Sequence, residues 1–90
     1  MQYLEIGQIV NTFGIKGQVK VVPFTDDITR FENLDTVYIE QGENLNEYTI
    51  EDVKYSKKLV LLKLKGIDDI NQTIPLKNCY LFSNSNFLME

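Results

Sequence analysis

The stretch that decides the fold is NTFGIKGQVKVVPFTDD, residues 11–27. It opens with a connection that contains Gly14 and Gly17 and continues into a segment in which Val19 and Val21 alternate with polar side chains. Alternation of apolar and polar residues is the pattern of a strand with one buried face. The glycines therefore lead into a strand, and the stretch is typical of the corner of a β-hairpin.

A phosphate-binding loop is the alternative interpretation of the two glycines. Dinucleotide loops require the pattern GxGxxG and P-loops the pattern GxxxxGK[ST], and each of them opens a helix. The sequence GIKG has neither pattern and precedes a strand, so no helix N-terminus is present to bind a phosphate. A hairpin that uses Gly14 and Gly17 for positive φ angles explains the glycines but leaves Phe13 and Lys16 without a structural role.

Six strands are expected in all, and the first two are those joined at this corner. They lie at residues 4–10, 17–22, 36–41, 48–55, 59–65 and 79–82. The connections between neighbouring strands are expected at residues 11–16, 42–47 and 56–58. The apolar phase slips between Ile50 and Val53, which predicts a β-bulge near Glu51 and Asp52. Short strands without βαβ spacing predict an all-β fold, a six-stranded antiparallel β-barrel.

Two short helical plugs are expected at the ends of this barrel. The first covers residues 26–34, where aspartates can cap a helix and Ile28, Phe31 and Leu34 repeat on one stripe. The second follows a further pair of aspartates. It is expected to be very short because the ring of Pro75 would clash with the carbonyl four residues earlier.

The paired carboxylates Asp26–Asp27 and Asp68–Asp69 could instead serve acid–base catalysis or bind Mg²⁺. Adjacent side chains, however, point in different directions on a helix or a strand. Both pairs also stand where helices are expected to begin, and there a carboxylate accepts hydrogen bonds from free amide groups. Helix capping is therefore the better interpretation of both pairs.

The composition excludes several classes of function. The 90 residues, 43% of them hydrophobic, fit one compact domain. The chain has no histidine and a single cysteine, Cys79, so a Cys/His metal site, a Cys–His nucleophile pair and an internal disulfide are excluded. No apolar run approaches the ~20 residues of a membrane helix. We expect a non-enzymatic, cofactor-free, cytoplasmic binding domain without a small-molecule substrate or a membrane partner.

The charges are unevenly distributed along the chain. The net charge of −4 argues against indiscriminate binding to nucleic acid. Between residues 25 and 52 every charged side chain except Arg30 is acidic, whereas between residues 53 and 65 all are lysines. Opposite potentials on two faces would suit docking onto a mixed surface of protein and RNA. Ordinary solvated strand faces are the alternative.

Aromatic residues and the cysteine also have two interpretations. Tyr48, Tyr55, Tyr80 and Phe82 could stack on nucleic-acid bases, although alternate aromatics in a small barrel more often pack in its core or rim. Cys79 is most simply a small buried apolar residue. No nucleophile, base and orienting group can be assembled, which favours a binding domain over an enzyme.

Two blocks of the sequence resemble the N-terminal domain of the RimM family, the ribosome maturation factors of bacteria. The blocks are IGQIVNTFGIKGQVKVVPFTDDITRF at residues 6–31 and LLKLKGIDDINQTIPLKNCYLF at residues 61–82. The first holds the family's Gly-Ile-x-Gly loop, its valine-rich strand and its Thr-Asp followed by an aromatic residue. The chain departs from the pattern where Phe13 replaces histidine, Thr73 and Ile74 replace Ala-Glu, Pro75 enters the helix and Asn78 replaces glycine.

The resemblance implies a barrel similar to domains of translation factors and a non-enzymatic role in ribosome biogenesis. Family members bind the immature small (30S) ribosomal subunit near its head, contact head protein nineteen and assist 16S rRNA processing. They carry a second, C-terminal barrel of the PRC type. Residues 1–83 would then form the N-terminal barrel and residues 84–90 the start of the linker, and the isolated domain is expected to be monomeric. A free-standing RNA-binding β-barrel is the alternative.

The candidate partner-binding residues lie in the hairpin loop and in the lysine-rich strand pair. They are Phe13, Gly14, Ile15, Lys16, Gly17, Lys54, Lys57 and Lys58.

Overall fold

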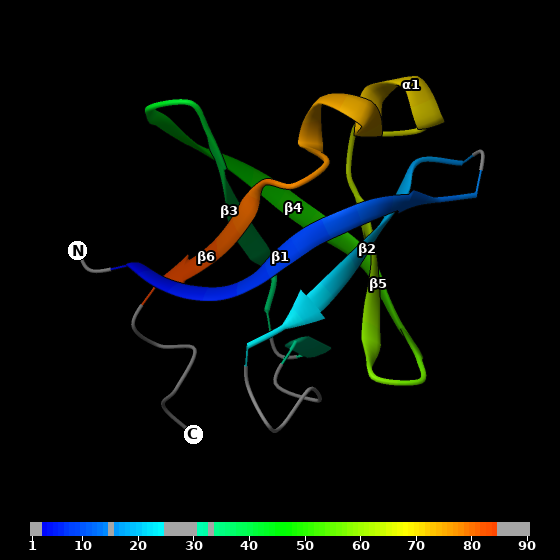
Figure 1. Cartoon of the computed structure of the whole chain (residues 1–90), viewed down its shortest axis with the longest axis horizontal. Helices are drawn as coiled ribbons and strands as arrows, with labels where there is room; N and C mark the ends of the chain where they lie inside the picture. Colours follow the sequence, from blue (N-terminus) through cyan, green and yellow to red (C-terminus); the bar gives the residue numbers. More distant parts are fainter. Residues whose placement is uncertain (1–2, 15, 25–30, 33, 85–90) are drawn as a thin grey trace.

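The computed structural model describes residues 3–14, 16–24, 31–32 and 34–84 (Figure 1). The strands in these residues are β1 (Tyr3–Phe13), β2 (Gln18–Pro23), β3 (Thr36–Gln41), β4 (Asn44–Ser56), β5 (Leu59–Leu64) and β6 (Tyr80–Asn84). Between β5 and β6 the chain forms helix α1 (Ile70–Thr73) and the 3-10 turn η2 (Ile74–Leu76). Neither helix in this part of the chain has the length and apolar character of a membrane-spanning segment.

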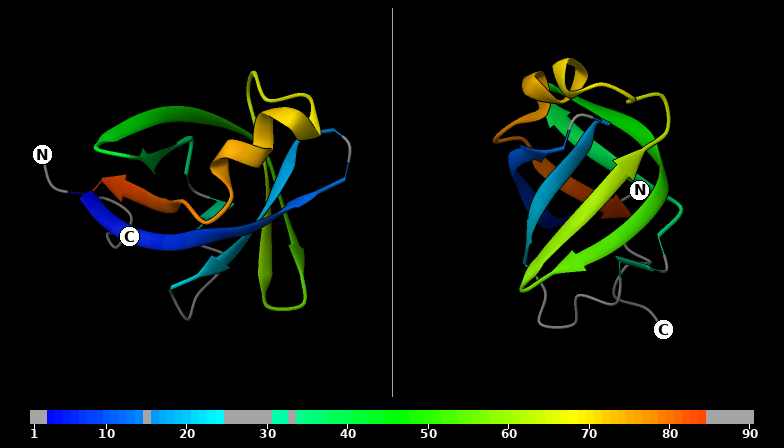
Figure 2. Two further views of the ribbon diagram at one scale, coloured as in Figure 1. Left: turned by 45° about the horizontal axis from the view of Figure 1, so that its top comes forward. Right: turned by 90° about the vertical axis from the view of Figure 1, so that its right-hand side faces the viewer.

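The six strands form a closed antiparallel barrel in the order β1-β2-β5-β4-β3-β6, with β6 pairing back onto β1. Figure 2 shows the strands wrapping around a common interior, with α1 and η2 over one end. The all-β, six-stranded fold expected from the sequence is confirmed. Because the sheet closes on itself, each of these six strands is paired with a neighbour on both sides.

The hairpins are tighter than the sequence predicted. β1 continues to Phe13, which pairs with Gln18, so the expected connection at residues 11–16 is wrong and only residues 14–17 join the strands. β4 begins at Asn44, and its partner in β3 is Gln41. The expected turn at residues 42–47 is therefore reduced to two residues, which Gly42 permits through its φ of +65°. These strand ends are mostly polar and mostly exposed, so they lack the alternation of apolar and polar residues by which a strand is predicted.

Bulges let the strands bend around the barrel. The bulge expected near Glu51 is confirmed, since the register between β4 and β5 shifts between Ile50 and Asp52. β1 carries two further irregularities, one in its pairing with each neighbour. At Gly7 a Cβ atom would lie 2.8 Å from both Val21 Cγ1 and the carbonyl oxygen of Val22, so the close approach of β2 requires glycine there.

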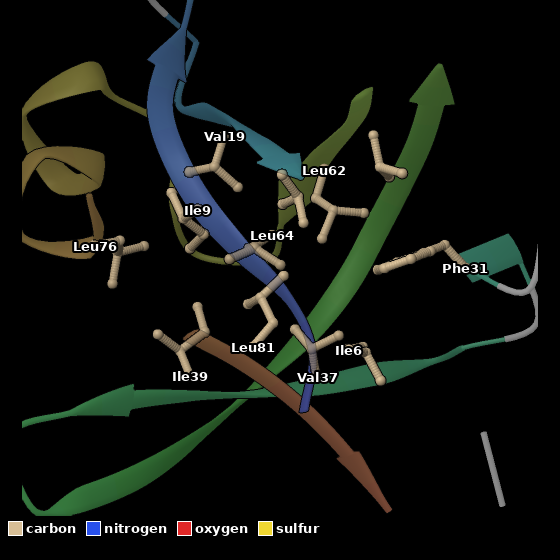
Figure 3. Close-up of a cluster of buried hydrophobic side chains, with 12 residues drawn as sticks. Ile6, Ile9, Val19, Phe31, Val37, Ile39, Leu62, Leu64, Leu76 and Leu81 are labelled. Atoms are coloured by element: carbon tan, nitrogen blue, oxygen red, sulfur yellow. The ribbon is translucent and has the colours of Figure 1, made fainter. Parts of the chain in front are cut away.

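The core is an apolar cluster inside the barrel (Figure 3). Val19 and Val21 are completely buried while Gln18 and Lys20 face outward, as the alternation predicted. Leu76 and Phe31 enter the cluster from opposite ends in Figure 3, so each closes one end of the barrel. The buried residues of the cluster are Ile6, Ile9, Val19, Val21, Phe31, Val37, Ile39, Val60, Leu62, Leu64, Leu76 and Leu81.

The second plug is confirmed, and its start and end have clear causes. Asp69 is the N-cap of α1, because its side chain accepts a hydrogen bond of 2.8 Å from the amide of Asn71. Pro75 stands in the first turn of η2, where the α-helix has already given way to a 3-10 turn. Leu76 then enters the core, whereas Ile74 is 58% exposed.

The first plug falls mainly outside the described residues, which include only residues 31–32 and 34 of its expected range. Within them, Phe31 is fully buried and Leu34 packs against the core, as the stripe predicted. Residues 85–90 of the expected linker also lie outside the described residues.

Candidate partner-binding surface

The loop between β1 and β2 presents Phe13 and Lys16 to solvent. Phe13 is the last residue of β1 and is 38% exposed, and Lys16, three residues further along the chain, is also exposed. Gly14 and Gly17 have φ angles of +70° and +89°, which confirms the positive values expected for a corner. Ile15 lies outside the described residues. The loop therefore offers an aromatic ring and a cation at the end of the barrel that α1 covers (Figure 1).

Gly17 fixes this loop against the segment that precedes α1. A Cβ atom at Gly17 would lie 2.7 Å from the carbonyl oxygen of Ile67 and 2.9 Å from the amide nitrogen of Asp69. By contrast, nothing lies within 4 Å of a Cβ atom at Gly14. One glycine is required for backbone packing and the other only for its φ angle.

Lys20, one of the polar side chains that alternate with Val19 and Val21 in β2, joins this surface. Its Nζ lies 5.4 Å from the centroid of the Phe13 ring, within the range of a cation–π interaction. Across the sheet, Lys20 is opposite Leu61, and Leu61 is opposite Lys54. Residues directly opposite one another point to the same face, so Phe13, Lys20 and Lys54 share the outer face of the barrel. That these three residues share a face follows from the register of the strands and could not be predicted from their spacing in the sequence.

The other candidate lysines lie apart from the loop. Lys57 and Lys58 form the turn between β4 and β5, where Lys57 has a φ of +59°. Gln18, next to the loop, pairs with Lys63 of β5. Lys63 is five residues from Lys58, a separation of about 16 Å at the rise of a strand. Figure 1 shows the β4–β5 turn at the opposite end of the barrel from the β1–β2 loop. The structure thus brings Lys54 toward the loop and places Lys57 and Lys58 far from it.

Lys63, from the same lysine-rich segment, is engaged within the domain. The three hydrogens of its Nζ are shared among four acceptors: Asp68 at 3.0 Å, Glu51 at 3.3 Å and the backbone carbonyls of Leu64 and Ile67. Burial acts to lower the pKa of Lys63, but the hydrogen bonds and charges of Asp68 and Glu51 outweigh it, so the pKa is raised. The acidic segment and the lysine-rich segment therefore meet where Glu51 of β4 accepts a hydrogen bond from Lys63 of β5.

The paired aspartates behave as structural groups where the structure describes them. Asp69 caps α1, as expected, and Asp68 forms an ion pair with Lys63. Asp26 and Asp27 lie outside the described residues. Within the described ranges, no group of three or more acidic or cysteine side chains is arranged to hold a metal ion.

The remaining aromatic residues divide between the core and the surface. Tyr48 packs against the core, and its hydroxyl donates to Gln41 Oε1 at 3.2 Å. Tyr55 and Tyr80 are each 37% exposed. Cys79 is half-buried against the core, and burial raises the pKa of its thiol, with a further contribution from the charge of Glu40.

The fold and the surface define a small antiparallel β-barrel domain that presents lysines and aromatic rings to solvent. Residues 4–88 match the family model described as the RimM N-terminal domain, and the chain belongs to this family. The resemblance seen in the sequence is thereby confirmed.

Curated relatives agree with this assignment. The chain is 48% identical over 80 residues to the ribosome maturation factor RimM of Clostridium botulinum, covering 89% of this chain and 46% of the relative. It is 43% identical over 82 residues to the protein of the same name from Clostridioides difficile, covering 91% and 47%. The chain thus spans about half the length of the curated relatives it matches.

Solved structures show the same fold. A crystal structure from Pseudomonas aeruginosa, described as a 16S ribosomal RNA processing protein RimM, has a TM-score of 0.88 at 24% identity, covering 98% of this chain and 54% of that one. The solution structure of the N-terminal domain of RimM from Thermus thermophilus has a TM-score of 0.80 at 20% identity, covering 100% and 98%. That solution structure comprises the N-terminal domain of the Thermus thermophilus protein.

Proposed function

We propose that this domain acts without catalysis in the maturation of the small ribosomal subunit in the cytoplasm. In this proposal it binds the immature subunit near its head, where head protein nineteen and 16S rRNA are its partners, and assists rRNA processing. Membership of the RimM N-terminal domain family is the observation that carries the proposal. The relatives' shared name, ribosome maturation factor, supports it.

The proposed contact surface is centred on the β1–β2 loop and extends along the outer face to Lys54. Phe13 and Lys16 are exposed there, and Lys20 lies over the Phe13 ring. An aromatic ring flanked by lysines can stack on a base or a side chain while the ammonium groups approach phosphates. Lys57 and Lys58 would contact the partner only if its surface extends along the length of the barrel.

Sedimentation of the full-length protein with precursor small subunits tests this surface. We expect Phe13→Ala and Lys16→Glu each to weaken binding at least about tenfold, because each removes a contact at the centre of the proposed interface. Lys77→Glu is the matched control, since Lys77 is exposed and belongs to none of the proposed contacts. Full binding by both loop variants would show that the loop is the wrong surface.

A separate measurement distinguishes this role from that of a free-standing RNA-binding barrel. The net charge of −4 opposes the approach of phosphates, and Lys63 is engaged within the domain. We therefore expect the isolated domain to bind an rRNA fragment only weakly. Submicromolar binding that falls steeply with salt would favour the free-standing RNA-binding barrel instead.

A further inference from the structure

The outer face of β3, β6, β1 and β2 carries a cluster of apolar side chains that the proposed subunit-binding surface does not use. Four of them are conspicuously exposed: Phe24 at 49%, Tyr3 at 41%, and Tyr80 and Val22 at 37% each. Large exposed apolar clusters usually mark an interaction site. We call this cluster the aromatic face, and its members are Tyr3, Val22, Phe24, Tyr38, Tyr80 and Phe82.

The pairing of the strands shows that the aromatic face is continuous. Phe82 of β6 lies opposite Tyr38 of β3 on one side and Glu5 of β1 on the other. One step along, Gln8 of β1 lies opposite both Tyr80 and Val22. Opposite residues share a face of the sheet, so the cluster crosses four adjacent strands.

Ring contacts join the cluster across the strands. The rings of Tyr3 and Tyr38 meet edge to face, with centroids 4.9 Å apart, and those of Phe24 and Tyr80 lie 6.3 Å apart. Figure 1 shows β6, β1 and β2 side by side on the side of the barrel nearest the viewer. The face is therefore a broad sheet surface rather than a set of isolated apolar residues.

The charges on the aromatic face favour a polypeptide over a nucleic acid. Glu5 lies within the face, and Glu40 is exposed two residues along β3 from Tyr38. Among the described residues, none of the strand partners of the six members is a lysine or an arginine. Lys20, two residues along β2 from Val22, is on the same outer face, but it lies over the Phe13 ring. Stacked bases would thus bring phosphates toward the carboxylates of Glu5 and Glu40.

The position where the chain leaves β6 indicates which polypeptide would bind the aromatic face. Asn84, the last residue of β6, pairs with Tyr3 at one corner of the aromatic face. The chain matches an N-terminal domain, and the curated relatives are about twice its length. We propose that the C-terminal half of the full-length protein docks on the aromatic face through apolar side chains. The interface within the chain would leave the β1–β2 loop free.

Amide spectra of the full-length protein and of residues 1–90 test the proposal without any substitution. We expect chemical-shift differences at the backbone amides of β6, of β1 from Tyr3 to Gln8 and of Val22 to Phe24, and small differences in β4 and β5. Differences confined to β4 and β5, or no differences apart from the residues next to the cut, would overturn it.

Substitutions on the face provide a second measurement. When the two halves are produced separately and mixed, Phe24→Ser and Tyr80→Ser should each weaken their association at least about fivefold. Tyr55→Ser is the matched control, because Tyr55 has the same 37% exposure as Tyr80 but lies on β4. Unchanged core amide signals in each variant would establish that it is folded. Equal weakening by Tyr55→Ser would contradict the proposal.

Two other possible occupants of the aromatic face, a second copy of this domain and a nucleic acid, can be distinguished from the C-terminal half by sedimentation and amide spectra. Sedimentation of residues 1–90 alone would reveal a dimer, and loss of that dimer on Tyr80→Ser would assign the face to a second copy. Titration with single-stranded RNA would identify a nucleic-acid site if the amides of the face shifted. Either result would overturn docking of the C-terminal half.

Discussion

The carbonyl oxygen of Ile67 lies 2.7 Å from the position that a Cβ atom on Gly17 would occupy. This relationship joins the β1–β2 loop to the segment that leads into α1, so the loop proposed to bind a partner is held by backbone packing. The neighbouring glycine, Gly14, has open space at the same position. The two glycines of the GIKG sequence thus have different roles.

Gly17→Ala should destabilise the domain much more than Gly14→Ala. At Gly14 only the positive φ angle opposes alanine, and we expect a loss of about 1 kcal/mol in the free energy of unfolding. At Gly17 the methyl group would also meet backbone atoms of Ile67 and Asp69, and we expect about 3 kcal/mol or more. Urea unfolding followed by circular dichroism measures both. Similar losses in the two variants would contradict the role assigned to Gly17.

Lys63→Met should lower the free energy of unfolding by about 1–3 kcal/mol, because the carbonyl of Ile67 and two carboxylates lose their donor. Lys65→Met is the control, since Lys65 is exposed, and its effect should stay within about 0.5 kcal/mol.

The contribution of Lys63 should also depend on pH in a defined direction. The pKa of Lys63 is raised above its ordinary value of 10.5, so its stabilising effect is fully present below that pH and is lost as pH rises through the folded-state pKa. The difference in stability between wild type and Lys63→Met should therefore be constant from about pH 7 to pH 9 and shrink above about pH 10.5. A difference that grew with pH in the alkaline range would show that the sign is wrong.

Leu76→Ala and Ile74→Ala test how η2 closes the barrel. Leu76 is 2% exposed and reaches the core, so its truncation should cost about 2–5 kcal/mol. Ile74, two residues earlier in the same turn, is 58% exposed and should cost about 0.5 kcal/mol or less. Thermal or urea unfolding of the two variants is the measurement. A small effect at Leu76 would mean that η2 does not contribute to the core.

The Cys79 thiol should ionise at higher pH in the folded protein than in the unfolded chain. Burial and the charge of Glu40 both raise its pKa. The rate of reaction with a disulfide reagent, measured against pH with and without urea, should show a higher midpoint in the native protein. Glu40→Gln should move the native midpoint partway down, and an unchanged midpoint in that variant would exclude the contribution of Glu40.

Local pattern alone predicted much of this domain. The alternation around Val19 and Val21, the phase slip after Ile50 and the stop at Pro75 depend on side-chain spacing and backbone chemistry that neighbouring residues determine. These features specified the class of fold, the bulge in β4, the short second plug and the exposed Phe13 and Lys16. Strand ends such as Asn11–Phe13 and Asn44–Glu47 were missed because they are mostly polar and exposed, and their apolar residues, Phe13 and Leu45, do not repeat with the period of a buried strand face.

The surfaces, by contrast, were decided only by the tertiary structure. Strand register places Lys20 and Lys54 in one row, because pairing across β5 depends on residues distant in the sequence. Barrel closure between β3 and β6 brings Tyr38 beside Tyr3 and completes the aromatic face. The sequence by itself predicted which residues of alternating segments such as 18–21 face inward and which face outward. Closure of the barrel decided which outward residues are neighbours, since contacts between distant strands follow from register and not from local spacing.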